Sequence, residues 1–149
     1  MSQEARDALA SNPNMVFQKE SQRDDIRDQN KTNTWLIEFL TRLVQTAGHP
    51  ILITALNSDH SPGTWHNPPG RAVDCWIADW QTVGDEKIID LMNAANAIGA
   101  SNDPALIEVG LSGDAARCMD DVNWSCSNVF VEDWGDSNEH VHFAVGVPY

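Results

Sequence analysis

The sequence predicts an α+β fold in which helices flank a small, mostly antiparallel sheet. Apolar residues recur at helical spacing in two stretches, one from Thr34 to Gly48 and one over 85–98. Short apolar stretches typical of strands lie between and after these helices, without the regular alternation of a wound α/β fold. The chain has 149 residues, which suffices for one domain with a single core.

Residues 1–31 are polar and show almost no apolar spacing. We expect a loose arm or a surface helix over Gln18–Gln29, outside a single domain formed by residues 32–149. The first residues are charged and lead into no apolar segment, so we expect no standard secretory signal and synthesis in the cytoplasm. No apolar run approaches the length of a membrane span, so membrane insertion is not expected.

The first helix carries one apolar stripe, made of Trp35, Leu36, Phe39, Leu40, Leu43 and Val44. Asn33 or Thr34 is suited to cap its start, and Gly48 with Pro50 ends it. Residues 51–56 then predict a buried strand. Residues 57–70 hold two turn signals and predict a loop, which is rich in His and Trp.

Residues 71–77 predict the next strand, and Gly99 is expected to end the second helix. A short strand is predicted over 107–111 and irregular structure over 112–128. Two final strands, 129–134 and 140–147, are expected to form a hairpin.

The chain is strongly acidic, with nine Lys and Arg against 22 Asp and Glu and a net charge of −13. After residue 50 the only basic side chains are Arg71, Lys87 and Arg117. Such a surface repels phosphate backbones, so nucleic-acid binding is not expected. It suits a cationic partner or bound metal cations, although a solvated acidic surface also accounts for most of these charges.

The three cysteines, Cys75, Cys118 and Cys126, form neither a Cys-x-x-Cys motif nor an even set. A thiolate zinc site and a disulfide framework are therefore disfavoured. Pairing of Cys118 with Cys126 and three free thiols both remain open.

Four of the five histidines lie in two short segments, 59–74 and 139–143. Strand alternation places His140 and His142 on one face of the last strand. Asp74 interrupts an apolar strand, where an ionised carboxylate needs a cation or several hydrogen bonds. His66 and His142 could both reach it, and two imidazoles with one carboxylate are a common ligand set for catalytic zinc.

Two motifs carry a resemblance to a known family. Thr64-Trp65-His66, followed by Gly70-Arg71-Ala72-Val73-Asp74, resembles the Ser-x-His-x-x-Gly-x-Ala-x-Asp signature of the zinc D-alanyl-D-alanine carboxypeptidases and L-alanyl-D-glutamate endopeptidases. Those enzymes have the hedgehog/DD-peptidase fold. Glu139-His140-Val141-His142-Phe143 resembles their second signature, Glu-x-x-His-Phe. The two motifs occur in the family's order, and the resemblance covers roughly residues 34–147.

The resemblance implies that His66, Asp74 and His142 bind Zn²⁺ and that Glu139 is the general base on the attacking water. Asp136, in the same loop as Glu139, is the alternative base. It also implies hydrolysis of peptide bonds in the stem peptides of bacterial peptidoglycan. A phage endolysin, released to the cell wall after synthesis, fits this activity, and we expect a monomer.

Four further residues are candidates for substrate binding or for support of the site: His60, Trp65, Arg71 and His140. Trp65 precedes a ligand and is expected in the cleft wall. Arg71 is the only basic residue near the motifs and is a candidate to hold a substrate carboxylate or the oxyanion. His140 could also be an oxyanion donor, an extra ligand or simply exposed, and His60 could line the cleft or be an ordinary loop polar residue.

The chain departs from the family in two places. One extra residue separates His66 from Asp74, within Asn67–Pro69, and no arginine follows the strand over 51–56. The missing arginine disfavours a carboxypeptidase and leaves open an endopeptidase, a different substrate or lost activity. A second hypothesis is therefore a zinc-stabilised structural or binding module without turnover, such as a virion or tail component.

Overall fold

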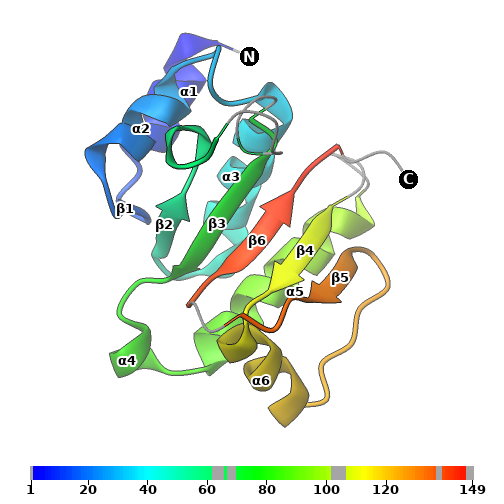
Figure 1. Cartoon of the computed structure of the whole chain (residues 1–149). Helices are drawn as coiled ribbons and strands as arrows, with labels where there is room; N and C mark the ends of the chain where they lie inside the picture. Colours follow the sequence, from blue (N-terminus) through cyan, green and yellow to red (C-terminus); the bar gives the residue numbers. More distant parts are fainter. Residues whose placement is uncertain (1, 62–65, 67–69, 102–106, 137–138, 147–149) are drawn as a thin grey trace.

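A computed structural model of the chain describes residues 2–61, 66, 70–101, 107–136 and 139–146. Six α-helices, a 3₁₀ turn and six strands are described (Figure 1). In chain order they are α1 (Gln3–Ala10), β1 (Met15–Phe17), α2 (Glu20–Arg27), α3 (Thr34–Ala47), β2 (Ile51–Ala55), η1 (Asn57–Asp59), β3 (Ala72–Ile77), α4 (Trp80–Val83), α5 (Glu86–Ala100), β4 (Glu108–Leu111), α6 (Gly113–Asp121), β5 (Phe130–Asp133) and β6 (Val141–Ala144). The α+β class is confirmed.

The six strands form one mixed sheet in the order β1-β2-β3-β6-β4-β5. The three central pairs, β2–β3, β3–β6 and β6–β4, are antiparallel, whereas the outer pairs β1–β2 and β4–β5 are parallel. The prediction of a mostly antiparallel sheet is therefore wrong. The reason is that each outer pair is joined through helices, α2 and α3 between β1 and β2 and α6 between β4 and β5, and such crossovers produce parallel pairs.

The predicted hairpin of the last two strands is also wrong. β5 and β6 both pair with β4, on its opposite sides, so they are not neighbours. β5 and β6 run in opposite directions, as in a hairpin, but β4 lies between them. A backbone hydrogen bond from Gly113 to the carbonyl of Asp136 fixes the connection between β5 and β6 close to the start of α6.

One face of the sheet packs on α3 and α5, which lie behind it in Figure 1. Alternation puts these apolar strand residues on that face, where they are buried: Ile51, Ile53, Val73, Cys75, Ile77, Val109, Leu111, Val141 and Phe143. The opposite face carries a different set, namely Leu52, Thr54, Asp74, Trp76, Gly110 and His142. Asp74 and His142 are thus held on the face that the two long helices leave uncovered.

The helices agree with the sequence in part. Asn33 caps α3 by accepting a hydrogen bond from the backbone N–H of Trp35 at 2.9 Å, and Gly48 ends it at φ +70°. Gly99 lies inside α5 rather than ending it, and a Cβ there would collide with the carbonyl of Asn128. The prediction of irregular structure over 112–128 is wrong over Gly113–Asp121, where Ser112 caps α6, and is confirmed over 122–128.

The first 31 residues differ from the expected arm. α2 falls within the range of the expected surface helix, but Gln22, Asp25 and Ile26 on it are buried. β1 extends the sheet beside β2, and Leu9 and Met15 join the main hydrophobic core. This segment is therefore integrated with the rest of the described chain.

None of the helices in the described ranges is long and apolar enough to cross a membrane. All three cysteines are free thiols. Burial raises the pKa of Cys75 well above its usual range, and it raises the pKa of Cys118 to about 11.

Candidate metal centre

Neighbouring strands position two of the three predicted ligands. Asp74 on β3 lies directly opposite His142 on β6 in the antiparallel register, and residues in such a pair point to the same face. His66 comes from the loop between η1 and β3 and is only 4% exposed. His60 directly follows η1. Four polar side chains from two strands and one loop therefore meet on the face that α3 and α5 do not cover.

The three predicted ligand atoms converge. Nδ1 of His142 lies 2.9 Å from Oδ1 of Asp74, and Nε2 of His66 lies 3.5 Å from the same oxygen and 3.2 Å from Nδ1 of His142. A tetrahedral zinc ion with bonds of about 2.0–2.1 Å separates its ligand atoms by about 3.3–3.4 Å. The donor types fit one such ion, and the two separations that involve His66 are close to these values. The 2.9 Å between Asp74 and His142 is a hydrogen-bond distance, which has to widen slightly when an ion is bound.

Hydrogen bonding within this group depends on which ring nitrogens carry a hydrogen. If Nδ1 of His142 and Nε2 of His66 are both protonated, each can donate to Oδ1 of Asp74, at 2.9 and 3.5 Å. In the tautomers that leave these two nitrogens unprotonated, their lone pairs face the carboxylate oxygen. A cation between the three atoms would then satisfy all the lone pairs together.

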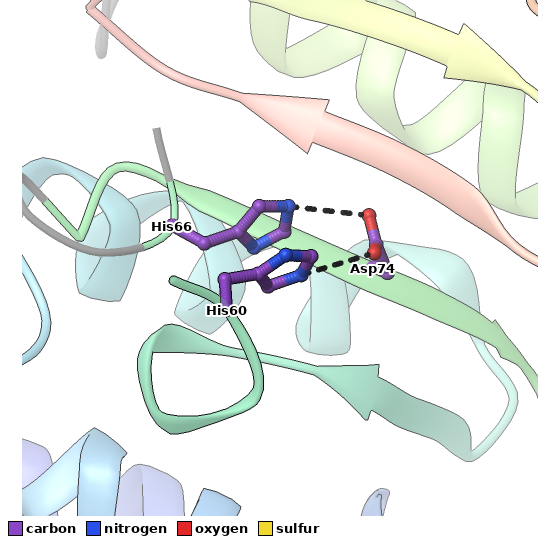
Figure 2. A group of neighbouring side chains, drawn as sticks. All are labelled: His60, His66 and Asp74. Atoms are coloured by element: carbon purple, nitrogen blue, oxygen red, sulfur yellow. Dashed lines mark ion pairs between the residues drawn. The ribbon is translucent and has the colours of Figure 1, made fainter. Parts of the chain in front are cut away.

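His60 lies at the other oxygen of the same carboxylate. Its Nε2 is 3.7 Å from Oδ2 of Asp74, and its ring stacks on that of His66 (Figure 2). His60, His66 and Asp74 each offer one ligand atom within 4.8 Å of the others, so this group could hold a metal ion.

The site favours the protonation states that metal binding needs. Burial opposes the charged form of Asp74, but the hydrogen bond with His142 and the charges of the nearby histidines outweigh it and keep the pKa of Asp74 below its usual value. Burial is the main reason that the pKa of His66 is lowered to about 4; Asp74 opposes this shift, while His142 and His60 add to it. At neutral pH the carboxylate is therefore charged and His66 is neutral.

A groove of about 540 Å³ opens beside Asp74. Its lining residues are Gln18, Leu52, Thr54, Ala55, Asp74, Trp76, Glu139 and His140. Glu139 is exposed, and it lines the same groove as Asp74, one of the proposed metal ligands. His140 has its Nε2 3.7 Å from Oδ2 of Asp136, so the alternative base Asp136 contacts His140.

Arg71 does not join this group. The guanidinium of Arg71 stacks over Trp35 of α3 at 4.6 Å and donates a hydrogen bond to the carbonyl of Gly146 at 3.2 Å. Those contacts place it on the helix-covered side of the sheet, away from Asp74. Trp65 and the extra residue within Asn67–Pro69 lie outside the described residues.

Trp134 lies against the site, although the sequence analysis gave a role in the cleft wall to Trp65 alone among the tryptophans. Its ring centroid lies 4.6 Å from that of His142. A Cβ on Gly110 would approach atoms of this indole to 2.5 Å, so the absence of a side chain at Gly110 provides the space that Trp134 occupies. A glycine inside a predicted strand is a signal of such a close approach.

No model of a known protein family matches the chain, and no curated protein or solved structure matches it either. Function is therefore inferred from the side chains of the site and from the two motifs.

Proposed function

We propose that the protein is a zinc-dependent peptidase that hydrolyses peptide bonds in peptidoglycan stem peptides. The observation that carries the proposal is the convergence of His66 Nε2, Asp74 Oδ1 and His142 Nδ1 beside an open groove. The substrate class is supported only by the resemblance of the two motifs to the zinc carboxypeptidases and endopeptidases.

In this proposal His66, Asp74 and His142 hold the ion. Bound zinc would polarise a substrate carbonyl and lower the pKa of a water molecule. Glu139, on the groove that Asp74 also lines, accepts a proton from the attacking water and passes it to the leaving amine. His140, on the same groove, donates a hydrogen bond to the oxyanion.

The groove favours an endopeptidase over a carboxypeptidase. Its lining contains no Lys or Arg, and all nine of these residues lie within the described part of the chain. Lys19, which adjoins the lining residue Gln18, is paired with Asp59 at 2.9 Å. A C-terminal carboxylate would enter the groove beside Asp74 and Glu139 without a partner of opposite charge, whereas an internal peptide bond brings no such charge.

The test combines zinc content with hydrolysis of purified peptidoglycan, measured as newly released amino groups. Wild type is expected to bind one zinc per chain and to cleave. Asp74→Asn is expected to lose zinc, whereas Glu139→Gln is expected to keep zinc and to lose about 10²–10⁴-fold in rate. Glu86→Gln, which removes an exposed carboxylate at the start of α5, is the matched control and should behave as wild type.

If the wild-type protein binds zinc but cleaves no peptidoglycan, the proposal that it is a peptidase is overturned. That result would favour the second candidate, a zinc-stabilised structural or binding module. The extra residue between His66 and Asp74 and the absent arginine are the observations that favour this candidate.

A further inference from the structure

His60 contacts the proposed metal centre but belongs to neither motif. Its Nε2 lies 3.7 Å from Oδ2 of Asp74, an electrostatic contact slightly longer than a hydrogen bond, while Oδ1 of the same carboxylate faces His66 and His142. We propose that His60 is a positioning residue, which fixes the orientation of the Asp74 carboxylate so that Oδ1 alone points to the ion. This inference rests on the metal site of the proposed function.

The stacked rings distinguish positioning from direct ligation. An imidazole binds a metal through a lone pair that lies in the plane of its ring. The rings of His60 and His66 are nearly parallel, at 16°, with centroids 3.7 Å apart (Figure 2). An ion in the plane of one ring therefore lies well outside the plane of the other. His66 is the ring whose nitrogen also reaches His142, so His66 is the ligand and His60 supports the carboxylate.

The backbone that carries His60 is anchored by α2. Asp59 accepts hydrogen bonds from Lys19 Nζ at 2.9 Å, Gln22 Nε2 at 3.2 Å and the backbone N–H of Leu56 at 2.9 Å. Burial would raise the pKa of Asp59, but these bonds outweigh it and lower that pKa below its usual value. The carboxylate is therefore charged at neutral pH and holds η1 firmly.

A second set of bonds ties the same turn to α2. The backbone N–H and the hydroxyl of Ser58 donate to the carboxylate of Asp25 at 2.8 and 2.6 Å. With η1 attached at both Ser58 and Asp59, the following residue His60 has a defined position. Its ring is further restricted by the stack on His66 and is 30% exposed.

Residues that orient a metal ligand affect affinity without binding the metal. Loss of such a partner typically weakens metal binding by about 10- to 100-fold. We expect this loss for His60→Ala. His60→Gln is expected to restore most of the affinity, because the glutamine amide places an N–H close to the position of Nε2.

The experiment uses the full chain with zinc alone as the probe. The zinc dissociation constant is measured by competition with a chromogenic chelator at pH 7. The visible spectrum of the cobalt-substituted protein reports the ligands themselves. His49→Ala is the matched control, because His49 contacts the carbonyl of Ala78 at 2.9 Å and lies outside the site. Thermal melting of the metal-free variants shows whether each still folds.

The outcomes separate the two proposals. Weaker binding by His60→Ala, with recovery and an unchanged cobalt spectrum in His60→Gln, supports the positioning role. Wild-type affinity in His60→Ala overturns it and leaves the metal site intact. A changed cobalt spectrum in His60→Gln also overturns it, since His60 would then be a ligand. If the wild-type chain binds no zinc, the proposed function itself fails.

Discussion

Trp134 covers part of the candidate metal centre because Gly110 lies beneath it. The indole packs against His142, which is 6% exposed, and a Cβ at Gly110 would overlap three of the indole's atoms. This glycine has a negative φ, so its importance lies in the space that it leaves rather than in its backbone conformation.

Gly110→Ala is therefore expected to displace Trp134 and to destabilise the protein by about 1–3 kcal/mol, the usual cost of overpacking. Urea unfolding measures this change in the free energy of unfolding. The control is the same substitution in a Trp134→Ala background, where the obstructing ring is gone and the cost should fall close to zero. An equal cost in both backgrounds would show that Trp134 does not occupy this position.

The contrast between Asp74 and Trp134 shows what the sequence reveals about the site. A carboxylate in an apolar strand and a histidine on the polar face of another are local signals, and the structure brings both side chains together. Their role as ligands stays a prediction. Trp134 carries no local signal of its own, because its position depends on β5 lying beside β4.

At the scale of elements, α3 is the best-predicted segment of the chain. Its apolar stripe is buried except for Trp35, which is 44% exposed, and its two ends lie where the sequence placed them. The two candidate caps are resolved in favour of Asn33, whose side-chain oxygen accepts the hydrogen bond from Trp35, while Thr34 is the first residue of the helix.

Asn33→Ala is expected to cost about 0.5–2 kcal/mol of stability, because one N–H of the first turn loses its partner. The same change at Thr34 is the matched control and should cost clearly less. Chemical denaturation of both variants, followed by circular dichroism, provides the comparison. A larger loss for Thr34→Ala would show that the cap is assigned to the wrong residue.

The mispredicted elements have two separate causes. α6 has only nine residues and buries mostly small side chains, so its apolar stripe is short and inconspicuous in the sequence. The order of β4, β5 and β6 depends on how the sheet assembles. The alternation of apolar and polar residues within a strand shows which side chains share a face, but it does not show which strands are neighbours. The two parallel edge pairs could not be predicted for that reason.

At the scale of the whole molecule, the N-terminal segment is part of the core that supports the candidate site. Leu9, Met15 and Ile26 belong to the same buried cluster as the central strands. Through Asp25 and Gln22 the segment also holds η1, next to His60. Its polar composition concealed this, since most of its side chains do face solvent and only a few make the core contacts.

Ile26→Ala tests whether the chain folds as one unit. Ile26 is fully buried, so the truncation should cost about 2–5 kcal/mol from lost burial and the cavity left behind. Val16→Ala, on the edge strand β1 at 38% exposure, is the control and should cost about 0.5 kcal/mol or less. Urea unfolding of each variant, followed by tryptophan fluorescence and by circular dichroism, should give one coincident transition that shifts for Ile26→Ala. Because none of the six tryptophans lies in the first 31 residues, a loose arm would leave the fluorescence transition unchanged, and that result would contradict the shared core.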